Sequence, residues 1–124
     1  MARLTVIHLS DVHLRGGTDG CLRFAREIAS ACFPVARDAD ACLLALTGDI
    51  AYGGKGSEYE AAADKLVRPI VGDIELETGR PVYVSVAPGN HDCILVPPDR
   101  VREAIAKAIV EDPTKAEDEN FVEA

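Results

Sequence analysis

Short apolar runs alternate along this chain with longer stretches in which apolar residues recur every three or four positions. Three runs rich in aliphatic and β-branched residues predict β-strands over residues 3–9, 41–47 and 81–87. The second run is continuously apolar, which is typical of a strand that is covered on both faces.

Helical spacing predicts a helix between the first two strands. Thr18 or Asp19 can cap its start, and we expect Pro34 to bend the helix or to end it early. The apolar positions that define this helix are Leu22, Ala25, Ile28, Ala29, Cys32, Val35 and Ala36.

A second helix is predicted before the third strand, and another helix after it. Ser57 and Glu60 form a capping-box pair at the start of the former. The latter begins near Asp99 and stops at Asp112–Pro113. Their apolar positions are Tyr59, Ala62, Ala63, Leu66, Val67 and Ile70 in the first, and Val101, Ala104, Ile105, Ala108 and Ile109 in the second.

The resulting order, β-α-β-α-β-α, predicts an α/β fold with a parallel sheet, right-handed crossovers and flanking helices. A chain of 124 residues suffices for one domain. We expect residues 1–112 to form that domain and the acidic residues 113–124 to fray.

Net charge and cysteine usage limit the partners and the cellular compartment that we expect for this chain. The formal net charge is −8, so the surface repels phosphate backbones and binding to nucleic acid is not indicated. No apolar run approaches the length of a membrane span, and no signal peptide precedes the first predicted strand. The 4 cysteines form no C-x-x-C pair, which favours reduced thiols. We therefore expect a cytoplasmic setting.

A cluster of polar residues follows each predicted strand. Asp11 and His13 follow the first, Gly48 and Asp49 the second, and the run Gly-Asn-His-Asp at 89–92 the third. Because the carboxyl ends of parallel strands share one edge of a sheet, the three clusters should converge. The glycine that begins each of the last two clusters permits a sharp turn and a close approach.

The residue types in these clusters indicate a metal centre. Carboxylate, imidazole and amide groups together suit Zn, Mn, Fe or Ni. Asp11 and His13 are near enough in sequence to bind one ion, Asp49 can bridge two ions, and Asn90 offers a neutral amide oxygen. Two ions about 3.5–4 Å apart would clamp a phosphate and activate a water.

His91 and Asp92 lie next to these candidate ligands. His91 is placed to protonate a leaving oxygen, and Asp92 to hold the imidazole and raise its basicity. These two residues are therefore the candidate catalytic groups.

The runs H-L-S-D-V-H, L-T-G-D-I-A and P-G-N-H-D, in that order, resemble the first three motifs of the calcineurin-like metallophosphoesterases. The resemblance spans residues 3–93, and the stretch 48–59 is similar to bacterial members. It implies an α/β sandwich of two mixed sheets with helices outside. It also implies two divalent or trivalent metal ions (Mn, Zn or Fe) and the hydrolysis of phosphomonoesters or phosphodiesters.

The same resemblance assigns roles to the site residues. By its motifs, Asp11 and His13 bind the first ion, and Asp49 bridges to the second ion, which Asn90 binds. His91 contacts the phosphate or the leaving group, with support from Asp92 on the same motif, and the substrate is a phosphate ester.

The family continues with a lone His and a G-H-x-H motif on the second sheet, whereas this chain has only His8, His13 and His91. We therefore expect the chain to be the N-terminal half of a metallophosphoesterase, completed by downstream domains or by self-association. The alternative is a non-catalytic metal-binding or interaction module of a larger protein.

Three further features have simpler interpretations. We expect His8 to be a core histidine of its strand rather than a hydrogen-bond donor that supports a ligand of the site. Cys93 is either an oxidation-sensitive thiol or a buried structural one. The run 53–57 lacks the spacing of a phosphate-binding loop and predicts a flexible connection.

Overall fold

The computed structural model describes residues 1–93, 107–108 and 111. The chain divides into two compact units, residues 1–94 and 95–124. In the second unit the described residues 107–108 and 111 are helical. The start of the helix predicted at Asp99, its end at Asp112–Pro113 and the acidic tail lie outside the described residues.

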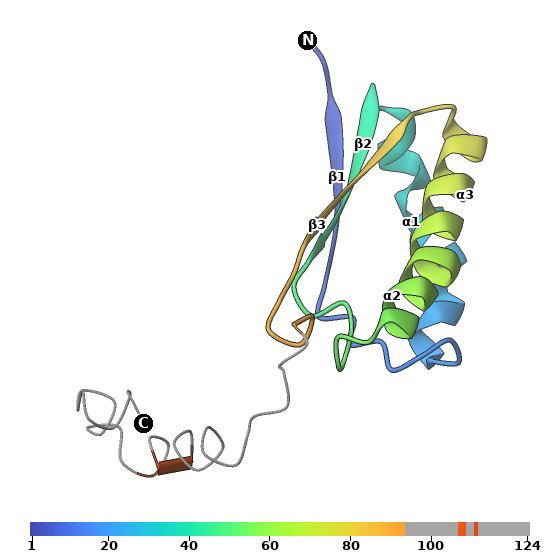
Figure 1. Cartoon of the computed structure of the whole chain (residues 1–124). Helices are drawn as coiled ribbons and strands as arrows, with labels where there is room; N and C mark the ends of the chain where they lie inside the picture. The colour runs from blue at the N-terminus through green and yellow to red at the C-terminus, as the bar shows by residue number, and fades with distance from the viewer. Residues whose placement is uncertain (94–106, 109–110, 112–124) are drawn as a thin grey trace. The chain divides into compact units, whose positions relative to one another are not determined.

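The first unit is built on a parallel sheet of three strands (Figure 1). The strands are β1 (Leu4–Ser10), β2 (Ala41–Thr47) and β3 (Val82–Ala87), in the order β1-β2-β3. The predicted α/β class and the three predicted strands are therefore confirmed. Parallel pairing brings the carboxyl ends of all three strands to the same edge of the sheet.

Two helical layers cover this sheet, and both lie on the same side of it (Figure 1). A short 3-10 helix (Gly20–Phe24) leads into α1 (Ala25–Arg37). The second layer runs without a break through α2 (Gly56–Ala62), a π-helical turn (Ala63–Val67) and α3 (Arg68–Thr78). Successive right-handed crossovers along a sheet of order β1-β2-β3 place their helices on one face.

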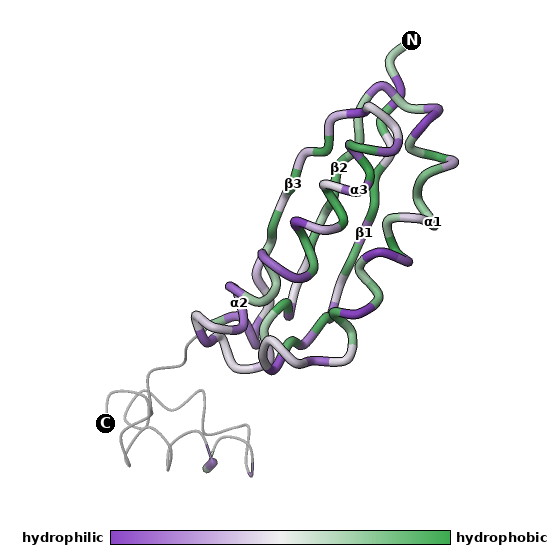
Figure 2. The backbone as a smooth tube through the Cα atoms, turned by 90° about the vertical axis from the view of Figure 1, so that its right-hand side faces the viewer, coloured by the Kyte–Doolittle hydropathy of each residue, from purple (hydrophilic) through white to green (hydrophobic). Residues whose placement is uncertain are grey.

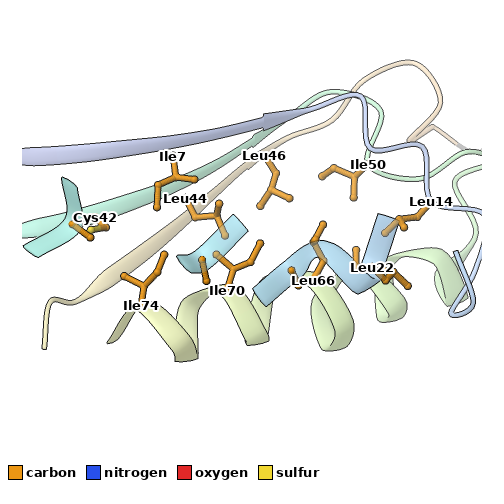
Figure 3. Close-up of a cluster of buried hydrophobic side chains, with 14 residues drawn as sticks. Ile7, Leu14, Leu22, Cys42, Leu44, Leu46, Ile50, Leu66, Ile70 and Ile74 are labelled. Atoms are coloured by element: carbon orange, nitrogen blue, oxygen red, sulfur yellow. The ribbon is translucent and has the colours of Figure 1, made fainter. Parts of the chain in front are cut away.

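The hydrophobic core fills the space between the sheet and these helices (Figure 3). Leu44 and Leu46 point from β2 toward Ile70 and Leu66 of the second helical layer, and all four side chains are almost fully buried. Aliphatic side chains buried in this way supply the main driving force for folding.

The opposite face of the sheet is open. Leu4, Val6 and Tyr83 are 58%, 56% and 62% exposed, although β1 and β2 are hydrophobic along most of their length (Figure 2). In β2, Cys42, Leu44 and Leu46 are buried, whereas the alternate residues are only half-buried. The prediction that β2 is covered on both faces was therefore wrong for the described residues, because both helical layers pack on one side.

His8 also lies on the open face, so its prediction as a core histidine was wrong. Its side chain is exposed, and its Nε2 lies 2.5 Å from the Thr47 hydroxyl on the neighbouring strand. Since β1 alternates between its two faces, His8 shares a face with Val6 and not with buried Ile7.

Two predictions about helix ends also need correction. Helix α1 continues past Pro34 to Arg37, so the alternative that Pro34 ends the helix was wrong, and a bend at Pro34 stays a prediction. Proline removes one backbone hydrogen bond, yet Ala29 and Ala36 on either side of it are fully buried and keep the helix on the core. The predicted start of this helical layer at Asp19 is confirmed, because the Asp19 carboxylate accepts the Cys21 N–H.

The capping box of α2 lies two residues before the predicted Ser57–Glu60 pair. Lys55 is the N-cap, and the carboxylate of buried Glu58 accepts the backbone N–H groups of Lys55 and Gly53, each at 3.0 Å. Glu58 thus satisfies donors at the helix start that would otherwise lack a partner.

Candidate metal centre

The loops that follow the three strands are held together by backbone hydrogen bonds. The Asp11 N–H donates to Gly48 O at 3.1 Å, and the His13 N–H donates to Asp49 O at 2.8 Å. The Gly48 N–H in turn donates to Ala87 O at 2.7 Å, which ties in the end of β3. The predicted convergence of the three clusters is therefore confirmed.

The backbone is strained at three of the predicted ligand positions. Asp11, His13 and Asp49 have φ values of 54°, 50° and 49°, and they are the non-glycine residues with positive φ in the described part of the chain. A left-handed conformation costs about 1–2 kcal/mol for most residues, and such strain clusters at functional sites. Three such positions at candidate ligands support a functional role for this edge of the sheet.

Glycine is required where the second and third loops meet. A Cβ atom on Gly89 would lie 2.5 Å from Asp49 N and 2.9 Å from Gly48 Cα, far inside contact distance. Gly48 itself has a φ of 72°. The two glycines therefore let the backbones of the loops approach each other directly, as their positions after the strands predicted.

Three side chains from the three loops form a group with ligand spacing. His13, Asp49 and His91 each offer a ligand atom, and these atoms all lie within 4.8 Å of one another. His13 Nε2 is 3.8 Å from Asp49 Oδ2, and the two imidazole rings are 5.0 Å apart in an edge-to-face arrangement. Two imidazoles with one carboxylate are a donor set that fits Zn, Mn or Fe.

The other two predicted ligands, Asp11 and Asn90, are not part of this group. Asp11 Oδ1 lies 3.8 Å from His13 Nε2, but the side chain is 68% exposed and is not one of the three grouped residues. The Ser10 hydroxyl donates to its other oxygen. The backbone carbonyl of Asn90 accepts the Cys93 N–H, and the ligand role of the Asn90 amide stays a prediction.

The orientation of His91 is fixed by two contacts that the motifs did not predict. The ring atom Nδ1 of His91 lies 2.8 Å from the backbone carbonyl of Tyr52. The backbone N–H of His91 donates to Asp49 Oδ1 at 3.0 Å. A carbonyl can only accept, so Nδ1 carries the hydrogen and the lone pair remains on Nε2. Histidines that bind metals are commonly held by such a carbonyl. Tyr52 is a site residue that the sequence motifs do not mark.

Asp92 does not hold the His91 imidazole, so this part of the prediction was wrong. Its carboxylate instead accepts hydrogen bonds from the backbone N–H groups of Gly89, Ala51 and Ile50 and from the Tyr59 hydroxyl. Burial raises the pKa of Asp92, but these donors outweigh it and hold the pKa below its usual range. Asp92 is thus an ionised carboxylate whose hydrogen bonds connect the second and third loops.

Tyr59 connects helix α2 to Asp92. Its hydroxyl donates to the backbone carbonyl of Asp92 at 2.6 Å. Burial, with the nearby Asp92 carboxylate, raises the pKa of Tyr59, so the hydroxyl stays protonated and can donate.

The four cysteines are free thiols. Cys42 is buried and Cys21 and Cys32 are half-buried, and burial raises the pKa of all three. Cys93 is exposed, with its sulfur 3.6 Å from Gly89 O, so the interpretation as a buried structural thiol was wrong.

The fold and site define an α/β protein with a candidate metal centre at the carboxyl edge of a parallel sheet. The chain matches the calcineurin-like phosphoesterase family over residues 4–122 and belongs to that family. Members are phosphoester hydrolases that generally bind divalent metals. Neither the curated proteins nor the solved structures contain a significant match. Among the described residues, no helix has the length and apolar character needed to span a membrane.

Proposed function

We propose that this chain supplies the metal-binding loops of a phosphoesterase that hydrolyses phosphomonoesters or phosphodiesters with two metal ions. The single observation that carries the proposal is the group of His13, Asp49 and His91, which come from three different strand ends. Two of these residues, His13 and Asp49, also have a left-handed backbone conformation.

The donor set suggests how the ions would be held. His13 and Asp49 would bind an ion directly, and Asp11, which lies next to His13, would be a further ligand. Asn90 would be a neutral ligand from the third loop. When bound, Mn, Zn or Fe ions polarise a phosphoryl oxygen and supply a nucleophile at neutral pH. The net charge of −8 otherwise disfavours a phosphate, so the local positive charge is what recruits it.

His91 would act through its Nε2 atom. Tyr52 O fixes the hydrogen on Nδ1, so Nε2 is free to bind an ion or, when protonated, to donate to the leaving oxygen. Asp92 is a positioning residue in this proposal, because it orders the loop that carries His91 and Asn90 through backbone hydrogen bonds.

The test is a metal titration by calorimetry, paired with hydrolysis of p-nitrophenyl phosphate and of its diester bis(p-nitrophenyl) phosphate. We expect wild type to bind Mn²⁺ or Zn²⁺ and D49N to bind it at least about tenfold more weakly, since a charged ligand is lost. D64N is the matched control, because Asp64 is exposed and pairs with Arg68 in the following turn. Equal affinity in wild type and D49N would contradict the proposal.

A second candidate is a non-catalytic metal-binding or interaction module of a larger protein. The open sheet face favours it, because exposed apolar surface marks interaction sites. In this case the chain binds metal as above but hydrolyses neither ester. Turnover by the chain alone contradicts this second candidate.

Three finer assignments complete the proposal. We place the domain boundary at residue 112, with 113–124 as a tail, and the protein in the cytoplasm, where its free thiols stay reduced. We further propose that a second copy of the chain or a downstream domain completes the site and covers the open sheet face.

A further inference from the structure

Arg15 and Tyr52 form a stacked pair beside the candidate metal centre. The guanidinium carbon of Arg15 lies 4.2 Å from the centroid of the Tyr52 ring, well within the range of a cation–π contact. The Tyr52 ring is 46% exposed, so the pair faces solvent. Neither residue belongs to the three motifs.

The backbone holds this pair in place. Leu14 and Ala51 form an isolated parallel bridge, and the Tyr52 N–H donates to Leu14 O at 2.9 Å. Arg15 and Tyr52 directly follow the two bridged residues, so the bridge that joins the first and second loops also brings these side chains together.

Tyr52 connects the cation to the metal-binding group. Its carbonyl accepts the His91 Nδ1 hydrogen, and its ring centroid lies 5.6 Å from that of His91 and 6.4 Å from that of His13. The guanidinium and both imidazoles are therefore neighbours of the same aromatic ring.

The charge of Arg15 has no carboxylate partner at ion-pair distance within the described residues. The nearby Asp19 carboxylate accepts the backbone N–H groups of Arg15 and Cys21 instead. A guanidinium that stacks through its face keeps its in-plane N–H donors free, and these match a phosphate in a bidentate manner.

We propose that Arg15, held on the Tyr52 ring, is an anion subsite for a second phosphate group of the substrate. The substrate class is then a phosphate ester or anhydride with two neighbouring phosphoryl groups. One would lie at the metal centre and the other at Arg15. This inference rests on the proposed function, since the metal centre binds the first group.

The test compares pyrophosphate with orthophosphate by calorimetry, on the full chain at one fixed free Mn²⁺ concentration so that chelation does not strip the site. Wild type should bind pyrophosphate more tightly than orthophosphate. R15Q should weaken pyrophosphate about tenfold, as expected for a lost charge-assisted contact, and change orthophosphate less than twofold. R15K, which keeps the charge but not the fork, should recover part of the loss.

R23Q is the matched control, because Arg23 stacks on the exposed Phe24 ring at 4.8 Å in a different part of the chain. It should bind both anions as wild type does. Y52L should weaken pyrophosphate less than R15Q, since it removes the platform and leaves the charge.

Three outcomes would overturn the inference. If R15Q binds pyrophosphate as tightly as wild type, or loses both anions equally while Mn²⁺ binding is normal, the subsite is wrong and the metal centre stands. If wild type binds no Mn²⁺, the proposed function fails, and the subsite fails with it.

Discussion

The body of the sheet and its carboxyl edge differ in almost every physical respect. In the body, aliphatic side chains such as Leu44 and Leu46 are buried and β2 alternates regularly between its faces. At the edge, the polar residues Asp11, His13 and Asp49 have a left-handed backbone, and the exposed fraction of their side chains falls from 68% through 36% to 14%. Burial in the body contributes most of the stability, whereas the left-handed positions at the edge cost free energy.

The largest expected effect tests the two faces of the body. Leu43 and Leu44 are neighbours in β2, but Leu44 is fully buried under the helices and Leu43 is half-buried on the open face. We expect Leu44→Ala to cost about 2–5 kcal/mol of unfolding free energy and Leu43→Ala about 1 kcal/mol. Urea denaturation measures both. Equal losses would show that the open face is covered in solution.

The next effect tests the close contact at the edge. We expect Gly89→Ala to cost about 1–3 kcal/mol, because its Cβ would meet the backbone of Gly48 and Asp49 and force the loops apart. Gly72→Ala in α3 is the control, since a Cβ atom there would have no described atom within 4 Å beyond its chain neighbours and its own helix backbone. That change should stabilise the helix by about 0.5–1 kcal/mol. Two substitutions of the same kind with opposite signs in a urea titration would separate edge from body.

A smaller effect isolates the strain itself. Asp11→Gly and Asp11→Ala both remove the carboxylate, but only glycine adopts a φ of 54° freely. The glycine variant should therefore be more stable than the alanine variant by about 1 kcal/mol. Metal affinity should fall equally in both. If the two variants are equally stable, the backbone at this position is not strained.

The smallest effect is expected at Asp19, where the loop after β1 meets the 3-10 helix that leads into α1. Backbone N–H groups of Arg15 and Cys21 hold the pKa of the Asp19 carboxyl below its ordinary value of 3.8. The stabilisation is therefore present above pH 3.8 and is lost as the pH falls through the lower folded-state pKa. Asp19→Asn keeps a capping side chain but cannot ionise.

The difference in stability between wild type and Asp19→Asn should thus shrink as the pH falls below 3.8, when measured by urea titration at each pH. Ser30→Ala serves as a reference, since the Ser30 hydroxyl donates to Arg26 O within α1 and does not titrate in this range. A pH-independent difference would show that the charge of Asp19 contributes nothing.

The sequence predicts the strands well for a physical reason. The apolar run from Ala41 to Thr47 is bounded by Asp40 and Gly48, and β2 has those limits. The motif residues follow the strands, so their convergence is a consequence of parallel pairing. The carboxyl edge was therefore predictable in outline.

What the sequence could not predict depends on contacts distant along the chain. The open face of β2 reflects the side on which both helical layers pack, which apolar content alone does not encode. The partners of Asp92 are backbone N–H groups, which carry no residue-specific signal. Tyr52 acts partly through its carbonyl, which every residue has, so no motif marks it.

The π-helical turn at Ala63–Val67 has a consequence for the length of the chain. Such a turn holds one residue more than the α-helix that it interrupts. Ala61 and Ala62 before it and Ile70 and Ile74 after it all face the core. Leu66 within the turn is also buried, whereas residues 63–65 are exposed. Deleting one of these exposed residues should therefore restore a regular α-helix and leave the buried segments on either side in phase.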